Sequence, residues 1–295
     1  MDIILYPVII FAFVLQTAFI KVFNERYNEN LASYSMFYAA SSVITVACLI
    51  AWAGGVPKIA HPMTIVFGVA FGTLFMATLL VYGMAMKTGP LSYTTLLFSA
   101  GMVIPVIAGV LLFHDRMSFL QAIGFVLILV TFYVVSKQKA DPGTGAKINS
   151  KWLFFVSLTF LGNGLLGFLS KSHQYLYPGD DKILYMAIGF ATTAVLSSIM
   201  LLFFTVLKKQ KIEAVRSPGL YTSIIVMGLT STVGNKLVMD LIGSVPVGVL
   251  FPIVNGGVML VVILMSRVVF REAITRRKAV GIVVGLTAII FLSLG

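Results

Sequence analysis

Apolar residues fall into ten long blocks along the chain, separated by short stretches that carry Lys, Arg, Asp, Asn, Gly or Pro. A helix needs about 20 apolar residues to cross the hydrocarbon core of a bilayer, and each block is close to that length. The blocks lie near residues 3–22, 31–53, 63–86, 90–113, 117–136, 152–171, 182–206, 219–241, 245–268 and 275–294. Because they are continuously apolar and do not alternate with period two, they predict membrane-spanning helices and not barrel strands.

The composition indicates the same class of protein. Hydrophobic residues make up 59% of the 295 residues and charged residues only 11%, and the mean hydropathy is +1.02. A soluble domain is about one quarter charged, so these values exclude an ordinary soluble enzyme, a disordered chain and a disulfide scaffold. The single cysteine, Cys48, lies inside an apolar block. We predict an all-α integral membrane protein of ten transmembrane helices, multi-pass in the cell (inner) membrane, with no soluble domain.

The basic residues indicate the orientation of these helices. Five of the 21 Lys and Arg residues fall at or beside the connections that follow even-numbered blocks, namely Lys58, Arg116, Lys171, Lys182 and Lys236. The other sixteen fall on the alternate side, which the positive-inside rule places in the cytoplasm, so both termini are predicted outside it. We interpret the net charge of +11 as this topology signal, and we expect no nucleic-acid partner.

The two halves of the chain are related in sequence. Phe113, Asp115, Gly124 and Ser136 match Phe270, Glu272, Gly281 and Ser293 at an offset of 157 residues, Pro90 and Gly101 match Pro246 and Gly257 at 156, and Lys21 matches Lys171 at 150. A hydrophilic stretch, 137–151, joins the halves, which we bound as residues 1–140 and 148–295. Each half has five helices, an odd number, so the second enters the membrane from the opposite side. Transporters built from such inverted repeats bind substrate near the midplane between the repeats.

The motif at the end of each half resembles a known family. It consists of an apolar helix, a charged loop and a Gly-containing helix, as in Phe113-His114-Asp115-Arg116 before Gly124 and Phe270-Arg271-Glu272-Ala273 before Gly281. This pattern is similar to the drug/metabolite transporter superfamily, in its ten-helix EamA-type branch, whose members usually show Gly-Glu-Arg at the loop. The resemblance covers the whole chain and implies a secondary transporter of small metabolites that works by alternating access.

Lys236 is the sharpest single candidate for substrate binding. It lies within the eighth block, next to Asn235, and a charge deep in a spanning helix costs at least ~2.5–3.5 kcal/mol. The functional interpretation is that Lys236 and Asn235 face a cavity and that the ammonium attracts an anionic group of the substrate. Two structural alternatives stay open: Lys236 reaches the nearer interface, or it pairs with Asp240 one helical turn away.

Two amides, Gln16 and Asn163, lie in the first helix of each half. At the 150-residue offset Asn163 corresponds to Phe13, which shares a helix face with Gln16. Both amides are therefore expected to point to equivalent sides of their repeats and to line a cavity. The alternative is a hydrogen bond between helices, which contributes about 0.6 kcal/mol on average in membranes.

Further candidates lie near prolines and glycines. Asn255 follows Pro252, which frees a helix carbonyl, so we expect a broken ninth helix that contributes Asn255 to the substrate site. Ser99 lies in the equivalent region of the fourth helix, with Pro105 one turn later. Tyr82 is the most deeply placed tyrosine that can stack on a substrate. The structural alternative is helix packing for Asn255 and Ser99, and for Tyr82 it is the belt of tyrosines at the membrane interface.

These features favour transport of a small polar metabolite that is anionic, zwitterionic or neutral, such as an amino acid. The first helix contains no acid, so export of lipophilic cations is disfavoured, although a multidrug efflux pump and a lipid or lipid-phosphate flippase remain alternatives. No Walker motif, zinc-binding spacing or catalytic triad is found, so we expect no enzyme activity, no metal and no cofactor. The expected partners are the substrate, the lipid bilayer and a coupling proton or counter-substrate, with either a monomer or a homodimer.

Overall fold

The computed structural model describes residues 4–58, 61–88, 91–136, 150–212, 217–269 and 276–294, and this part of the chain contains helices and no strand. The helices are α1 (Leu5–Arg26), α2 (Leu31–Trp52), α3 (Met63–Thr88), α4 (Leu91–Ala100), α5 (Val103–Leu112), α6 (Phe119–Ser136), α7 (Ser150–Leu176), α8 (Lys182–Leu202), η2 (Phe203–Leu207), α9 (Pro218–Ile242), α10 (Val247–Val269) and α11 (Arg276–Leu294). The π-helical η2 continues α8 without a gap. The joint between the predicted halves, at 137–149, and the second loop motif, at 270–273, lie outside the described residues.

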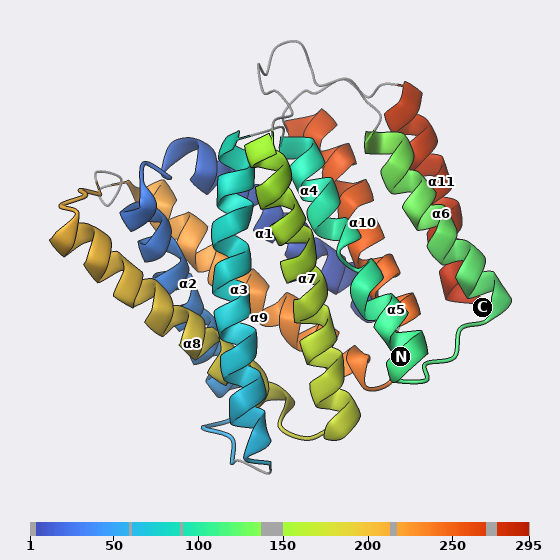
Figure 1. Cartoon of the computed structure of the whole chain (residues 1–295), viewed down its shortest axis with the longest axis horizontal. Helices are drawn as coiled ribbons and strands as arrows, with labels where there is room; N and C mark the ends of the chain where they lie inside the picture. The colour runs from blue at the N-terminus through green and yellow to red at the C-terminus, as the bar shows by residue number, and fades with distance from the viewer. Residues whose placement is uncertain are drawn as a thin grey trace. The chain divides into compact units, whose positions relative to one another are not determined.

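The predicted all-α fold is confirmed, and a helix lies at each of the ten predicted blocks (Figure 1). Seven helices are long and apolar enough to cross a membrane, and three shorter apolar segments lie at Leu96–Leu112, Phe119–Val134 and Ala279–Leu294. These are the helices of a membrane protein. The fourth block is the exception to one helix per block, because it is divided into α4 and α5.

The break between α4 and α5 has a local cause. Pro105 has no N–H to donate to the carbonyl of Gly101, and that carbonyl instead accepts from the N–H of Ile104 at 3.0 Å, in a tighter turn. The break that we expected in the ninth block is wrong, since α10 runs unbroken through Pro252. Pro252 is only the sixth residue of α10, so its ring lies over the first turn, where the loss of one hydrogen bond does not stop the helix.

The contacts between Cα atoms divide the chain into two compact units. Unit 1 consists of Met1–Met76 and Leu176–Asp240, and unit 2 consists of Ala77–Tyr175 and Leu241–Gly295. Each unit therefore takes segments from both halves of the sequence. The chain passes from one unit to the other within α3, α7 and α9.

In unit 1, α2 and α8 pack side by side in opposite directions (Figure 1). The beginning of α2 lies at the end of the α8–η2 helix, where the Asn30 side-chain amide donates to the Lys211 carbonyl at 2.8 Å. The same Asn30 caps α2, because its side-chain oxygen accepts from the N–H groups of Ala32 and Ser33. Asn30 thus caps the start of α2 and also holds it against the end of the α8–η2 helix.

Glycines let other helices of unit 1 approach closely. Gly72 of α3 lies against Gly189 of α8, where a Cβ at position 72 would collide with the Gly189 carbonyl. The hydroxyl of Thr193 donates to the Gly72 carbonyl at 3.1 Å, so the two backbones are also linked by a hydrogen bond. Membrane helices associate through such small residues because lipid supplies no hydrophobic force to drive them together.

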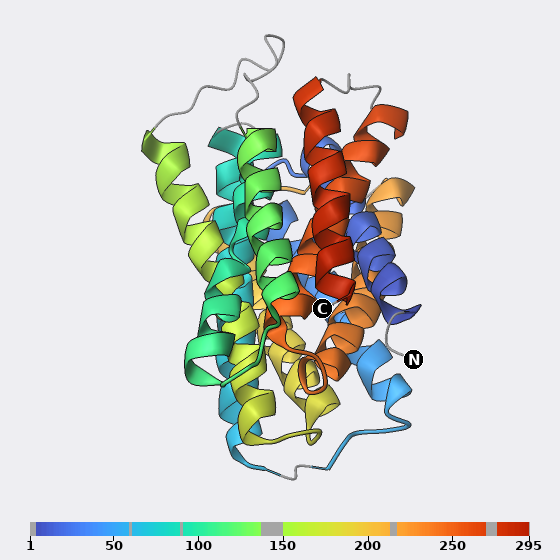
Figure 2. The same ribbon diagram turned by 90° about the vertical axis from the view of Figure 1, so that its right-hand side faces the viewer.

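In unit 2, α6 and α11 pack side by side in opposite directions (Figure 2). Gly124, near the start of α6, lies against Ala288 and Leu292, near the end of α11. The start of α6 is capped reciprocally, because the N–H of Gln121 donates to the Ser118 hydroxyl and the N–H of Ser118 donates to the Gln121 side chain. Gly124, which the sequence repeat singled out, is therefore a packing residue.

Replacement of Gly72 by leucine is expected to destabilise unit 1. The new side chain meets backbone, which cannot move aside as a flexible side chain can, so the cost is expected to exceed the usual ~1–3 kcal/mol for overpacking. The matched control is Ala70→Leu, because Ala70 lies exposed on the same helix. Thermal unfolding of the purified protein in detergent measures both, and equal midpoints for the two variants would contradict the close α3–α8 approach.

Candidate functional site

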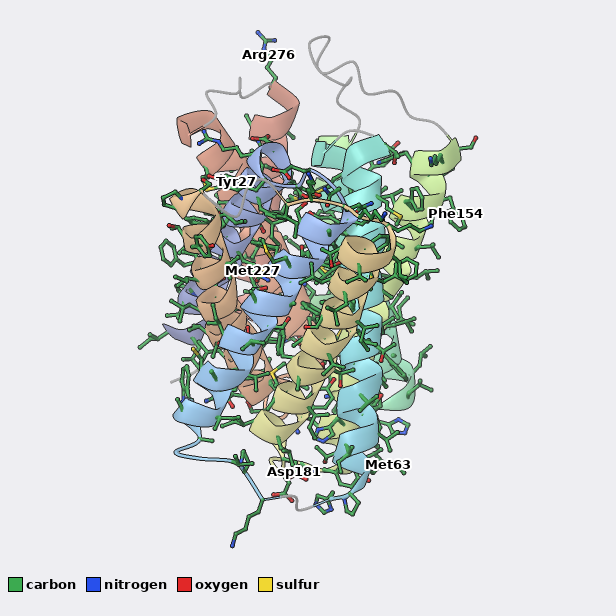
Figure 3. All side chains as sticks on the ribbon, turned by 90° about the vertical axis from the view of Figure 1, so that its left-hand side faces the viewer. Tyr27, Met63, Phe154, Asp181, Met227 and Arg276 are labelled. Atoms are coloured by element: carbon green, nitrogen blue, oxygen red, sulfur yellow. The ribbon has the colours of Figure 1, made fainter. Side chains whose placement is uncertain are left out.

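A polar groove of 380 Å³ lies in unit 1, where the end of α2, the start of α8 and the last turns of α9 meet. It is lined by Ala53, Pro57, Lys58, Gly179, Asp181, Lys182, Ile183, Leu184, Lys236 and Asp240. Asp181 and Met63 lie at this end of unit 1, and Tyr27 lies at the opposite end (Figure 3). We call this feature the Lys236 groove.

Lys236 makes two contacts at the groove. Its Nζ lies 2.5 Å from a carboxylate oxygen of Asp240, one turn further along α9. The same Nζ lies 4.9 Å from the ring centroid of Trp52, the last residue of α2, in a cation–π contact. The side chains of Lys236 and Asp240 are 18% and 32% exposed, so both are within reach of a ligand. The alternative in which Lys236 pairs with Asp240 is confirmed, and the pair faces a groove.

The depth of Lys236 follows from its position on α9. It lies six residues before the end of the helix, or about 9 Å at 1.5 Å per residue. Lys236 therefore lies halfway between the middle of its helix and its end. Lys58 and Lys182, which the sequence placed on the same side as Lys236, line the same groove. The lining thus holds three lysines against two aspartates, an excess of positive charge.

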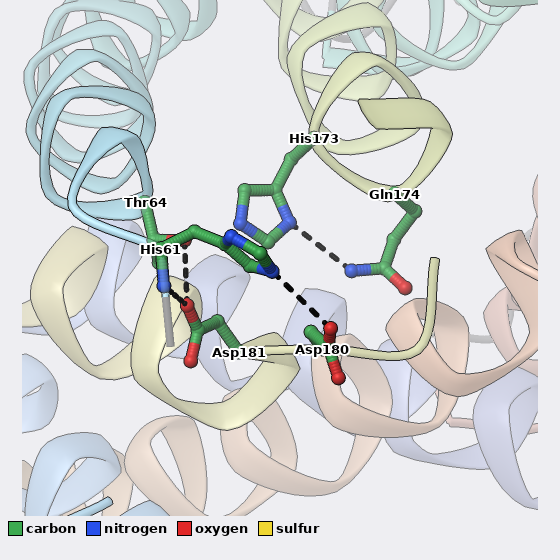
Figure 4. A network of polar contacts seen from close by, with 6 residues as sticks. All are labelled: His61, Thr64, His173, Gln174, Asp180 and Asp181. Carbon is green, nitrogen blue, oxygen red and sulfur yellow. Dashed lines mark hydrogen bonds and ion pairs between the residues drawn. The ribbon is translucent and has the colours of Figure 1, made fainter. Parts of the chain in front are cut away.

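One of the two aspartates has a structural role (Figure 4). A carboxylate oxygen of Asp181 accepts from the main-chain N–H of His61 at 2.8 Å and from the hydroxyl of Thr64 at 3.0 Å. These bonds fix the start of α3 to the start of α8. The ring of His61 also lies 3.2 Å from Asp180 and stacks on Tyr177. Asp181 is therefore occupied by these hydrogen bonds. Asp240 is the other acid of the groove, and a ligand can bind it by taking the place of Lys236.

Gln16 and Asn235 converge on one residue of α9. The Gln16 amide donates to the Ser231 hydroxyl at 3.2 Å, and the Asn235 amide donates to the Ser231 carbonyl at 2.9 Å. Phe13 lies against Gly234, so positions 13 and 16 of α1 share a face, as predicted, and this face contacts α9. Ser231 lies five residues before Lys236, deeper along the helix.

A second group of predicted residues gathers in unit 2 around the break between α4 and α5. The Asn163 amide of α7 donates to the Phe98 carbonyl at 2.8 Å, and the same carbonyl accepts from the N–H of Gly101. The Tyr82 ring lies 4.9 Å from the Phe98 ring, and Ser99, the next residue, is 6% exposed. Tyr82 and Asn163 thus both contact Phe98 beside the break, and Ser99 follows Phe98 in the chain.

The seven predicted residues are divided between the two units. Gln16, Asn235 and Lys236 belong to unit 1, and Tyr82, Ser99, Asn163 and Asn255 belong to unit 2. The Asn255 amide donates to the Phe251 carbonyl of its own helix at 3.0 Å. Among the residues that the structure describes, no three His, Cys, Asp or Glu side chains gather as a metal ion would require.

An ion pair that the sequence interpretation missed lies in unit 2. Lys171 Nζ is 2.8 Å from Asp115, and the two side chains are 10% and 12% exposed. The second carboxylate oxygen of Asp115 accepts from the N–H of Val247, the first residue of α10, at 3.0 Å. Both residues belong to the sequence repeat, which was the available signal. The sixth block is predicted to end near Lys171, whereas α7 continues to Leu176, and Asp115 compensates the charge of Lys171 within the helix.

Comparison with known proteins bears on the fold. No family model and no curated protein matches the chain. Among solved structures 28 chains match, and one, described only as the crystal structure of a protein, has a TM-score of 0.74 over 99% of this chain and 97% of that chain. The sequence identity is 12%, so the likeness shows the fold alone.

Replacement of Lys171 by alanine is expected to destabilise the protein by about 3–5 kcal/mol, because it leaves the buried Asp115 carboxylate unpaired. The double variant Lys171→Met with Asp115→Leu removes both charges and is expected to recover much of that loss. The measurement is unfolding of the purified protein in detergent.

The control for this prediction is Glu25→Gln, which removes an ion pair on α1 whose acid is 56% exposed. Such a pair contributes at most about 1 kcal/mol. If Lys171→Ala lowered the free energy of unfolding by no more than Glu25→Gln does, the Lys171–Asp115 pair would not stabilise unit 2.

Proposed function

We propose that the protein is a secondary active transporter that moves a small polar metabolite across the cell membrane by alternating access. The observation that carries the proposal is the Lys236 groove, in which a cation, an anion and an aromatic ring lie together at the ends of membrane-spanning helices. A volume of 380 Å³ suits a small molecule. Charged residues in spanning helices mark substrate and ion pathways, since they are costly to insert.

The helix pairing supports the inverted repeats, 1–140 and 148–295. The α2–α8 pair joins the second helix of each half, the α6–α11 pair joins the fifth helix of each half, and both pairs are antiparallel. A two-fold axis in the membrane plane relates helices in this way. The resemblance to EamA-type transporters is part of this proposal.

Contacts of the first helices support the same repeat. Phe13 lies against Gly234 in unit 1, and Gly162 lies against Thr78 in unit 2. At the offsets of 150 and 156 residues, the counterparts of Phe13 and Gly234 are Asn163, next to Gly162, and Thr78. The two units therefore use one contact pattern twice, as two copies of an ancestral half would.

The groove favours an anionic or zwitterionic substrate over a lipophilic cation. Its lysines outnumber its aspartates, so a cation without a negative group meets a net positive lining. The multidrug pump is for this reason the weaker alternative. The excess of lysines keeps a lipid-phosphate flippase as the second candidate function. A coupling proton or counter-substrate drives the cycle, and no enzymatic step is proposed.

We expect the full chain in proteoliposomes to take up at least one solute from a panel of amino acids, organic acids, nucleosides and cationic drugs. Lys236→Ala is expected to weaken the apparent affinity about tenfold or more, because a hydrogen bond to a charged group contributes about 1.5–3 kcal/mol. Lys151→Ala, which removes an exposed basic residue of α7, is the control and should leave uptake unchanged.

Three outcomes would contradict this proposal. Uptake of cationic drugs that is undiminished by Lys236→Ala would favour a multidrug pump. Movement of a labelled phospholipid between leaflets, with no solute uptake, would favour the flippase. Absence of both activities in correctly folded protein would remove the transport proposal itself.

Reporter fusions test the predicted orientation. With both termini outside the cytoplasm, alkaline phosphatase fused after Gly295 is expected to be active and green fluorescent protein at the same position to be dark. A fusion after Gln210 is the internal control, because Gln210 follows α8–η2 on the side predicted to be cytoplasmic. At this position alkaline phosphatase should be inactive and green fluorescent protein fluorescent. A fluorescent C-terminal fusion would invert the whole topology and place the Lys236 groove on the cytoplasmic side.

A further inference from the structure

Three lysines gather at the end of the α8–η2 helix of unit 1, whereas the Lys236 groove lies at the start of the same helix. Lys208, Lys209 and Lys211 follow η2 directly, and all three are exposed. We call residues 208–211 the basic turn. The last turns before it expose a set of large apolar side chains, namely Leu202, Phe203, Val206 and Leu207. Because this helix is long and apolar enough to span the membrane, these side chains face lipid tails and the basic turn lies at the lipid headgroups.

The π-helical turn brings the first lysine onto the apolar face. In a regular α-helix, positions 203 and 208 lie about 140° apart around the helix axis. In η2 the N–H of Lys208 donates to the Phe203 carbonyl at 3.3 Å, so the two residues are one wider turn apart. Lys208 Nζ consequently lies over the Phe203 ring, 6.0 Å from its centroid. One face of the helix therefore carries an exposed ring with a cation directly beyond it.

Hydrogen bonds to α2 hold the basic turn in place. Lys209 has a left-handed backbone, with φ of 51°, which reverses the chain after η2. The Gln210 side chain accepts from the N–H of Ala32 at 3.1 Å. The Lys211 carbonyl accepts from the side-chain amide of Asn30. The lysines are thus presented from a fixed backbone, so a ligand that binds them has little of the chain to order.

The charges around the basic turn add to a positive surface. Among the described residues of this turn, the last two turns of α1 and the start of α2, five are basic and two are acidic, namely Lys21, Arg26, Lys208, Lys209, Lys211, Glu25 and Glu29. Glu25 lies 3.9 Å from Lys21 on its own helix. Five positive charges against two leave an excess of three, which attracts a ligand with a negative group.

We propose that the basic turn and the exposed apolar side chains of η2 bind an anionic phospholipid of the adjoining leaflet. The lysines bind the phosphate of the headgroup, and the acyl chains lie along the apolar side chains. A soluble phosphate uses the lysines alone, and a zwitterionic lipid brings a cation that the lysines repel, so an anionic lipid is the ligand that fits both parts of the surface. The lipid stays bound at this place, and the inference is independent of the transport proposal.

The test is binding of phosphatidylglycerol to the delipidated full chain in detergent, measured by native mass spectrometry. Phosphatidylcholine with the same acyl chains and inorganic phosphate are the comparison probes. We expect phosphatidylglycerol to bind about tenfold or more tightly than phosphatidylcholine, and an equal concentration of inorganic phosphate not to displace it. Equal binding of the two lipids, or displacement of phosphatidylglycerol by phosphate, would overturn the assignment of an anionic lipid.

Single substitutions locate the lipid on the chain. Lys208→Gln and Lys211→Gln are each expected to weaken phosphatidylglycerol binding about fivefold, the contribution of one basic residue near an anionic membrane surface. Lys151→Gln is the matched control, because it removes one exposed lysine at the start of α7, in unit 2, and should leave the affinity within about twofold. An equal loss in Lys151→Gln would mean that any exposed lysine suffices and would overturn the site.

Lys209→Gly separates lipid binding from folding. Glycine adopts a φ of 51° without the steric cost that a lysine has there, so the thermal midpoint in detergent without added lipid is expected to stay the same or rise. The change also removes one charge, so phosphatidylglycerol binding should weaken about fivefold. Unchanged lipid affinity in this variant would show that the basic turn does not hold the headgroup.

Discussion

The structure depends on compensating charge inside helices whose outer surfaces face lipid. A charge in the hydrocarbon region has no water to hydrate it, so it is retained only where an opposite charge lies beside it. Lys171 with Asp115 and Lys236 with Asp240 meet this condition in different ways. The side chains of the first pair are only 10% and 12% exposed, and the pair joins three elements of unit 2. The second is open to a groove, where its side chains are 18% and 32% exposed.

Close helix packing is the second constraint, and small residues meet it. Gly72 against Gly189 in unit 1 and Gly124 against the end of α11 in unit 2 bring backbones together where any larger residue would collide. The same residues explain why the helices pair as they do. The polar groups that this packing buries, such as Thr193 and Asn163, are satisfied by carbonyls of the neighbouring helix. The same helix contacts therefore provide both the close packing and the hydrogen bonds of the buried polar groups.

The sequence predicted the helices, whereas the contacts of the candidate residues had to come from the structure, and the reason is physical. Spanning length and apolarity are local properties, so all ten blocks were found. Whether a proline breaks a helix depends on where that helix begins, which is why the break lies before Pro105 and not at Pro252. The sequence alone predicts a block that ends at Lys171, because the partner of this lysine, Asp115, is distant in sequence. Lys236 stands out in the sequence as a charge within an apolar block, but its depth depends on where α9 ends.

The position of Asp240 in the chain has a mechanical consequence. It is the last residue of unit 1 on α9, and Leu241, its neighbour on the same helix, already belongs to unit 2. The Lys236–Asp240 ion pair therefore spans the last full turn of α9 before the chain enters unit 2, so it stabilises that turn as well as facing the groove.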